Sequence, residues 1–304
     1  MSADLALSAR KKADAVDLGS VAVCSLIWGT TWFAITLQLG TVPPVVSVVY
    51  RFALAAALLF GWLALTRQPM RLTGPQHLAS LGQGLFTFAL DYSFVYFAEE
   101  RIPSAVVAVL FAGLAYVNLV AFRLIHGQRA SRLAWGGAAL GIAGVAVMSA
   151  GELMRADMDG AAVTGVALAL AGVAAATVGN LFAHRGQRVG APVGAAVGWA
   201  MVYGTGALVL YVLLTGTPWR LEATPEYVGS LVYLSVFGSV VSFLIYFALA
   251  RRRGYAFASY IAAITPPLAL LMSVLFEGAE FGAPAFAGLA LVLAGQVMLS
   301  RAPR

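Results

Sequence analysis

Lysine is almost absent from this 304-residue sequence, and cysteine and histidine are scarce. The only lysines, Lys11 and Lys12, stand near the start of the chain, so no phosphate loop of the form G-x-x-x-x-G-K-S/T exists and ATP hydrolysis of that kind is excluded. The single cysteine, Cys24, cannot form an intramolecular disulfide. The three histidines do not cluster with carboxylates at metal-ligand spacing. We therefore expect neither a metal site nor a cofactor.

Charged residues are also scarce, at 11% of the chain, whereas hydrophobic residues make up 61%. A soluble globular domain has roughly 25% charged and 45–50% hydrophobic residues, so a water-soluble fold could not bury this much apolar surface. The net charge of +6 could suggest a nucleic-acid partner, but the distribution of the basic residues gives a simpler explanation. We expect a lipid bilayer, and no nucleic acid, around this protein.

Long hydrophobic stretches fill nearly the whole chain. About 20 apolar residues in a helix cross the roughly 30 Å hydrocarbon core of a bilayer. The sequence has ten such stretches, at residues 18–38, 43–66, 78–98, 103–124, 132–151, 161–183, 191–215, 226–250, 254–276 and 282–300. The predicted fold is an all-α integral membrane protein with ten transmembrane helices, preceded by an N-terminal segment, residues 1–17.

The positive charges gather on one side of the predicted membrane. Fifteen of the 19 basic residues lie in alternate links, for example Arg251 to Arg253 after the eighth span. Acidic residues such as Glu99 and Glu277 gather in the links between them. Because lysine and arginine are retained on the cytoplasmic side during insertion, both termini are predicted to be cytoplasmic.

The two halves of the sequence resemble each other at an offset of about 150 residues. The run Tyr96 to Ala98 (YFA) matches the run Tyr246 to Ala248, and other short matches fall in the same order. Each half holds five spans, an odd number, so the second half enters the membrane from the opposite side. We predict inverted repeats at residues 18–151 and 161–300, an arrangement that exposes a central site to each side in turn. Duplication that serves folding alone is the alternative.

Two charged residues, Arg51 and Asp91, lie well inside the predicted spans. Each is about 10–12 Å from the outer end of its span, where an isolated charge is costly. We favour a buried ion pair between the two, because the pairing satisfies both groups. The alternatives are that Arg51 holds a substrate carboxylate or that Asp91 carries a coupling proton.

Aromatic and polar side chains deep in the spans are candidates for substrate binding. The two tryptophans and Tyr92 lie deeper than an interfacial belt, and the serines and Tyr246 belong to a polar stripe on the eighth span, which should face protein or water and not lipid. The alternative role for each is helix packing or helix–helix hydrogen bonding. The candidates are Trp28, Trp32, Tyr92, Asn118, Asn180, Ser239, Ser242 and Tyr246.

Two consecutive prolines, Pro266 and Pro267, lie near the middle of the ninth span. They remove two backbone donors, bend the helix and leave carbonyl groups that must find other partners or face a cavity. We predict a break in the helix at this point that serves as a hinge or a binding element.

Several short motifs resemble those of the EamA-type drug/metabolite transporters. They are the run Trp28 to Phe33 (WGTTWF), Pro44 followed by the run Tyr50 to Phe52 (YRF), and Glu277 and Glu280 before a glycine-containing last span. The resemblance covers both halves, and within the superfamily the chain looks most like the YddG-type aromatic amino-acid exporters. It implies a basket of helices around a central cavity, lined largely by spans one, three, four, six, eight and nine. It also implies alternating access and export across a bacterial inner membrane.

An aromatic, weakly polar cavity would suit small amphipathic solutes, because a ring can stack on tryptophan or tyrosine while hydroxyl and amide groups take the polar end. The predicted function is therefore secondary export of aromatic and other neutral amino acids. Export of drugs or other metabolites is the alternative within transport, and a non-transporting membrane scaffold is the alternative outside it. We find no catalytic constellation and do not expect an enzyme.

Overall fold

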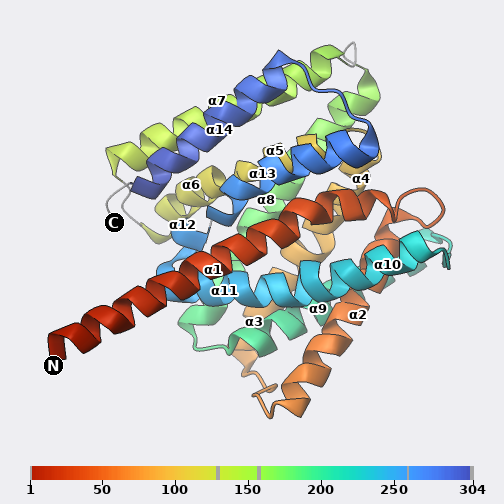
Figure 1. Ribbon diagram of the computed structural model, residues 1–304. Coiled ribbons are helices and arrows are strands. Elements are labelled where there is room, and N and C mark those ends of the chain that lie inside the picture. Colours follow the sequence, from red (N-terminus) through yellow and green to blue (C-terminus); the bar gives the residue numbers. More distant parts are fainter. Residues whose placement is uncertain (1, 128–130, 156–158, 259, 302–304) are drawn as a thin grey trace.

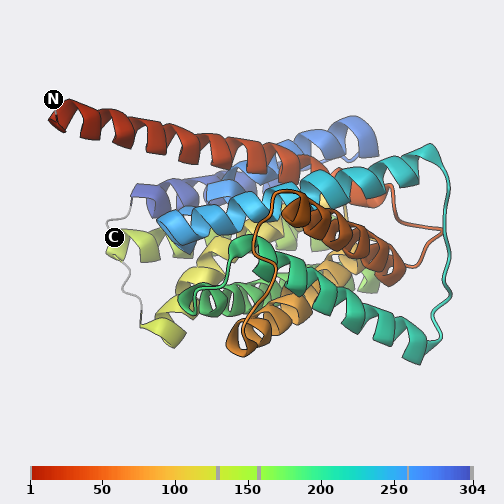
Figure 2. The ribbon, with the colours of Figure 1, turned by 90° about the horizontal axis from the view of Figure 1, so that it is seen from below.

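The protein is a bundle of helices (Figure 1). The computed structural model describes residues 2–127, 131–155, 159–258 and 260–301, and every regular element within these ranges is helical. Both chain ends lie at the same end of the bundle, and the start of the first helix projects beyond its neighbours (Figures 1 and 2). An even number of crossings would produce this placement of the two ends.

The first half of the chain supplies five helical stretches, two of which are divided. They are α1 (Ser2–Thr36), α2 (Pro44–Leu65), the series α3 (Gly74–Gln83), η1 (Gly84–Asp91) and α4 (Tyr92–Glu99), the series α5 (Ser104–Ala112) and α6 (Leu114–His126), and α7 (Arg132–Arg155). Pro44 stands at the start of α2, where its missing N–H costs no helical hydrogen bond. Gly127, with φ of 64°, ends α6 in the left-handed conformation that favours glycine.

The second half repeats this pattern. Its elements are α8 (Gly160–Arg188), α9 (Val193–Thr215), the series α10 (Pro225–Tyr233), η2 (Leu234–Val241) and α11 (Ser242–Arg253), the series α12 (Tyr255–Ala258), α13 (Tyr260–Met272) and η3 (Ser273–Glu277), and α14 (Ala283–Arg301). At the start of α10, the Thr224 hydroxyl accepts a hydrogen bond from the Tyr227 amide at 3.4 Å, so a side chain satisfies one of the free amides of the first turn.

Seven helical stretches are long and apolar enough to cross a membrane. They are Ala15–Thr36, Pro44–Leu65, Ser104–His126, Arg132–Arg155, Gly160–Arg188, Val193–Thr215 and Pro225–Arg253. Shorter apolar helices cover Thr265–Glu277 and Ala283–Met298. Helix is present in each of the ten expected ranges, but the count of ten crossings stays a prediction.

Two helices contain the same unusual backbone feature, a π-helical segment of eight residues. The segments η1 and η2 are separated by 150 residues at both ends, since 234 − 84 = 150 and 241 − 91 = 150. The internal sequence match has the same offset. Such segments change the register of the side chains along a helix and are frequent at functional sites.

Helices α7 and α14 lie side by side because glycine removes the side chains between them (Figure 1). A Cβ atom added at Gly144 would lie 2.6 Å from the Gly288 carbonyl oxygen, and one added at Gly288 would lie 2.7 Å from the Gly144 carbonyl oxygen. The two backbones therefore approach as closely as small residues permit.

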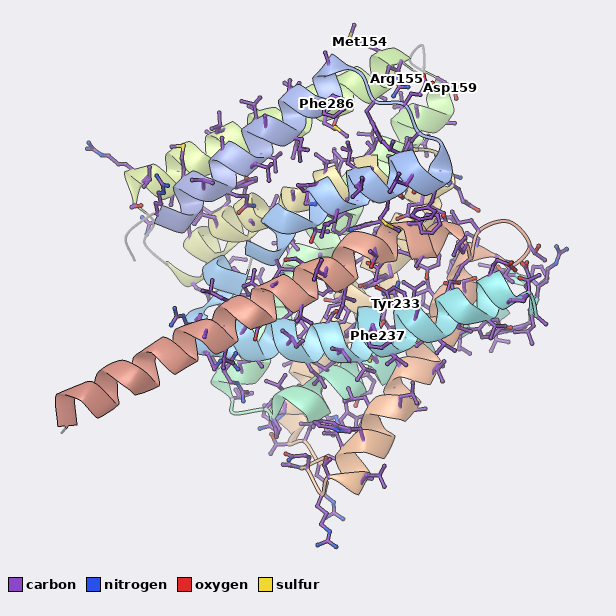
Figure 3. All side chains as sticks on the ribbon, in the orientation of Figure 1. Met154, Arg155, Asp159, Tyr233, Phe237 and Phe286 are labelled. Atoms are coloured by element: carbon purple, nitrogen blue, oxygen red, sulfur yellow. The ribbon has the colours of Figure 1, made fainter. Side chains whose placement is uncertain are left out.

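Helix α1 is held against the second half of the chain at two places along its length. Asp17 forms ion pairs with Arg252 at 3.0 Å and Arg253 at 3.4 Å, after the eighth expected span. Farther along α1, the hydroxyl groups of Thr30 and Tyr233 are 2.6 Å apart, and the neighbouring Phe237 ring is 5.7 Å from the Tyr233 ring (Figure 3). The segment 2–17, predicted as separate, continues into the first span as one helix.

The predicted break at Pro266 and Pro267 is absent, because α13 continues through both prolines. The turn before them carries its own hydrogen bond, from the Thr265 hydroxyl to the Ile261 carbonyl oxygen at 2.8 Å. Helix α13 also packs against α1 and α5. Neighbouring helices and hydroxyl side chains of this kind allow proline inside a membrane helix. The hinge role of the two prolines is therefore a proposal only.

Candidate binding cavity

A central cavity opens between the two halves of the chain. Its lining comes from α1, η1, α4, α5, α6, α8, α11, α12 and α13, which belong to expected spans one, three, four, six, eight and nine. The space not occupied by protein atoms is ≈ 890 Å³, including the part open to solvent. Apolar and aromatic side chains make up most of the lining, as is usual for ligand cavities.

Five of the eight residues predicted to bind substrate line this cavity, and Asp91 lines it as well. The five come from α1, α4, α8 and α11, so four helices far apart in the sequence bring them together. They are Trp28, Trp32, Tyr92, Asn180 and Tyr246.

Ring contacts hold the tryptophans of α1 in the cavity wall. The Trp28 indole N–H donates to the Gly238 carbonyl oxygen at 3.1 Å, and its ring lies 5.4 Å from Phe243 and 5.5 Å from Tyr246. The Trp32 ring lies 5.2 Å from Phe111. Tilted and edge-to-face pairs at these distances are favourable, so the walls are stiff before any solute binds.

Arg51 lies behind the cavity wall and is only 1% exposed. Its guanidinium carbon is 4.5 Å from the Tyr92 ring centroid, and its Nε donates to the Ser239 hydroxyl at 3.0 Å. The Ser235 hydroxyl donates to the backbone carbonyl of Arg51 at 3.0 Å. Cation–π contact with a desolvated arginine contributes about 2 kcal/mol, so Arg51 holds Tyr92 in place.

The predicted ion pair between Arg51 and Asp91 differs from the structure, in which no contact between the two is found within the described residues. Successive residues on a helix point about 100° apart, so an arginine that stacks on Tyr92 lies to one side of Asp91. Asp91 Oδ1 has no hydrogen-bond partner in the described part of the chain, although the side chain is only 6% exposed.

The other three candidates lie outside the cavity lining. Ser239 accepts the hydrogen bond from Arg51, and the Ser242 hydroxyl donates to the Phe237 carbonyl oxygen at 2.8 Å. The Asn180 amide donates to Asn118 Oδ1 at 3.5 Å, so Asn118 stands behind a residue that does line the cavity. These polar groups join helices and position the wall.

Four lining residues present a buried polar atom without a hydrogen-bond partner among the described residues. Native proteins pair nearly all such atoms, so these four are the atoms of the lining residues that a water or a solute could complete after small side-chain movements. Together they offer hydrogen-bond donors and one carboxylate in an aromatic surrounding. The atoms are Trp32 Nε1, Thr87 Oγ1, Asp91 Oδ1 and the Tyr246 hydroxyl oxygen.

Sequence reasoning missed Thr87, Phe111 and Phe243, all of which line the cavity. Thr265, directly before the two prolines of the predicted hinge or binding element, lines it as well. A signal for Thr87 existed, because it precedes Asp91 by four residues and such residues share a helix face. Phe111 and Phe243 carried no signal, since phenylalanine is equally common on lipid-facing surfaces. Within the described residues, no group of three or more metal-ligating side chains occurs.

The sequence matches the model of the EamA-like transporter family twice, over residues 18–150 and 163–301. A protein of Escherichia coli (strain K12) named uncharacterized inner membrane transporter YedA is 27% identical over 257 residues, which cover 84% of this chain and 80% of that protein. Protein PagO of Salmonella typhimurium is 29% identical over 118 residues, 39% of each chain. One crystal structure, 19% identical, covers 94% of this chain and 97% of its own with a TM-score of 0.70, so the two share a fold.

Proposed function

Because the chain belongs to the EamA-like transporter family, we propose that this multi-pass membrane transporter exports small amphipathic metabolites, above all aromatic and other neutral amino acids. The observation that carries the proposal is the set of unpaired polar atoms in an aromatic cavity. The assignment to the YddG-type exporters is part of this proposal. The similarity to the EamA-like family, YedA and PagO supports transport but names no solute.

The proposed topology is ten crossings in two inverted repeats, residues 18–151 and 161–300. Two family matches, one in each half, support it. So do the π-helical segments 150 residues apart and the placement of both chain ends at one end of the bundle. We place the chain in a bacterial inner membrane with cytoplasmic termini, because its arginines gather at that end and because relatives such as YedA are named inner membrane transporters.

In the proposed complex, the solute ring stacks between the aromatic walls formed by Trp28, Trp32, Tyr92 and Tyr246. The ammonium group faces the Asp91 carboxylate, and the carboxylate group accepts hydrogen bonds from Trp32 Nε1 and other donors of the wall. Asn180 lines the cavity, whereas Asn118, Ser239 and Ser242 position it. The Pro266–Pro267 segment serves as a hinge for alternating access, since it adjoins Thr265 in the lining.

A second candidate is export of amphipathic organic cations. An unpaired carboxylate, Asp91, among tryptophan and tyrosine faces is the arrangement that binds such cations, through charge and cation–π attraction. The two candidates differ in one group of the solute, because an amino acid carries a carboxylate and an organic cation does not. A zwitterionic amino acid should compete for efflux far better than its decarboxylated amine if the first candidate is right.

Flux from proteoliposomes tests the proposal. The purified chain should release labelled phenylalanine, tryptophan or threonine with saturable kinetics. Trp32→Ala should lower kcat/KM by roughly tenfold to a hundredfold, equivalent to about 1.4–2.7 kcal/mol. The substitution removes both an aromatic ring of the cavity wall and a hydrogen-bond donor. Trp62→Ala is the matched control, since Trp62 is 47% exposed on α2 and absent from the cavity lining. Flux equal to that of empty liposomes for every amino acid would reject the substrate class.

A further inference from the structure

Glu99 is a buried carboxylate that the cavity does not use. It ends α4, its side chain is 8% exposed, and neither carboxylate oxygen has a hydrogen-bond partner among the described residues. It follows Asp91 by eight residues, about 12 Å along the helix. Val95 lies between the two at four-residue spacing and lines the cavity. One helix face therefore leads from the cavity to Glu99.

Four buried polar side chains toward the outer end of the bundle, as defined by the predicted orientation, make up what we call the outer polar layer: Gln38, Arg51, Tyr96 and Glu99. None of the four is more than 8% exposed. The Tyr96 hydroxyl donates to Gln38 Oε1 at 2.7 Å. In this part of the structure, Gln38 Nε2 and Arg51 Nη1 have no hydrogen-bond partner.

Charges of both signs act on Glu99, but none pairs with it within the described residues. Glu277 at the end of η3 repels its charge, and Arg51 on α2 attracts it. Glu277 is itself held by Ser104, whose amide donates to Oε2 at 3.4 Å and whose hydroxyl donates to Oε1. Glu100 and Arg101 pair with each other at 3.2 Å, so Arg101 does not neutralise Glu99 directly.

An ionised carboxylate that is buried without a partner costs several kcal/mol, and a second carboxylate nearby adds to the cost. The burial of Glu99 therefore favours its neutral, protonated form. Opening the layer would let water reach the carboxylate and remove the cost of ionisation. Protonation of Glu99 and closure of the outer side are thus coupled in free energy.

We propose that Glu99 is the outer proton-binding site of a proton-coupled export cycle. The proposal rests on the proposed function, because it concerns what drives the same cavity. A proton from the outer side binds the Glu99 carboxylate and allows the outer polar layer to close. When the cavity opens toward the cytoplasm, water from the cavity reaches Glu99 past Val95, carries the proton to Asp91 and releases it toward the cytoplasm. The solute moves outward in exchange.

The test uses the full-length chain in proteoliposomes with labelled phenylalanine as the probe. Counterflow at equal pH on both sides measures transport alone. A second assay sets the interior one pH unit more acidic than the exterior, so that outward proton flow drives solute inward. For exchange of one proton per solute, a gradient of one pH unit supports accumulation up to about tenfold.

The wild-type chain should show both activities. Glu99→Gln should keep counterflow within about threefold and lose accumulation, because the amide cannot release a proton. Glu99→Asp should keep both, since it retains a carboxylate. Glu100→Gln is the matched control, because Glu100 is the neighbouring carboxylate but is exposed and paired with Arg101. It should behave as wild type.

The wild-type chain alone shows whether transport is coupled to protons, even if a variant fails to fold. Counterflow without accumulation in the pH gradient would overturn proton coupling and leave the proposed function intact. Accumulation retained by Glu99→Gln would overturn the role of Glu99. Absence of counterflow for every amino acid would reject the proposed function and, with it, this proposal.

Discussion

Replacing Gly179 with alanine should deform the cavity wall, because α8 approaches η1 closely at this glycine. A Cβ atom at residue 179 would lie 1.9 Å from Thr87 Oγ1, and 3.1 Å from both Cβ and the amide nitrogen of Thr87. Ordinary van der Waals contact begins near 3.4 Å, so the hydroxyl must move by 1.5 Å, since 3.4 − 1.9 = 1.5. Overpacking of this size costs about 1–3 kcal/mol. It also moves one of the unpaired donors in the lining.

Two measurements follow the effect of Gly179→Ala. Thermal unfolding of the purified protein in detergent should show a lower midpoint, and flux from proteoliposomes should show a higher KM for phenylalanine. The matched control is Gly206→Ala, on α9, where an added Cβ atom would meet nothing within 4 Å. That change should leave KM unchanged and stabilise the helix by roughly 0.5–1 kcal/mol, because alanine replaces a mid-helix glycine.

A second substitution tests whether the effect of Gly179→Ala comes from steric contact with Thr87. Thr87→Ala removes the atom that the new Cβ would strike, so the double variant Thr87→Ala with Gly179→Ala should be more stable than the sum of the single effects predicts. If Gly179→Ala behaves like Gly206→Ala in both assays, α8 and η1 are not in the close contact described, and the geometry of the cavity wall is wrong.

Three further substitutions test other parts of the structure. Arg51→Lys should lower stability by about 1–3 kcal/mol in thermal unfolding, because lysine cannot both donate to Ser239 and stack on an aromatic ring with a planar group; unchanged stability would contradict the described contacts of Arg51. Gly144→Leu should separate α7 from α14 and lower the yield of folded monomer in size-exclusion chromatography; a normal yield would contradict the close approach to Gly288. Asp91→Asn should raise the KM for phenylalanine by roughly tenfold or more, equivalent to about 1.4 kcal/mol, without a loss of protein; an unchanged KM would remove Asp91 from solute binding.

Helical periodicity was sufficient to find much of the cavity. Trp28, Trp32 and Tyr92 line it. A membrane span that carries large aromatic or polar side chains at this depth must direct those side chains toward protein and away from lipid. Asn180 and Tyr246 line it for the same reason. A polar side chain at that depth needs a partner, and the cavity is one of the places that supplies water or solute.

Helical periodicity could not distinguish a polar side chain that faces the cavity from one that hydrogen-bonds to another helix. Ser239 needs a partner, but its partner is Arg51 on α2, and a pattern within one helix cannot identify a partner on another. The π-helical segments η1 and η2 also change the register within two spans, so a strict period of 3.6 misplaces residues on one side of each segment relative to residues on the other side. The continuous helix through Pro266 depends on neighbouring helices, which are likewise invisible in the local sequence.

Labelling of Thr87→Cys in a Cys24→Ala background tests the central claim most directly. Thr87 lines the cavity, and Cys24 is the only natural cysteine and is buried. A carrier with alternating access predicts that a membrane-impermeant thiol reagent reaches residue 87 from either side of the membrane, and that phenylalanine slows the reaction from both. Reaction from one side only, or a rate that no amino acid changes, would contradict a cavity that opens to each side in turn.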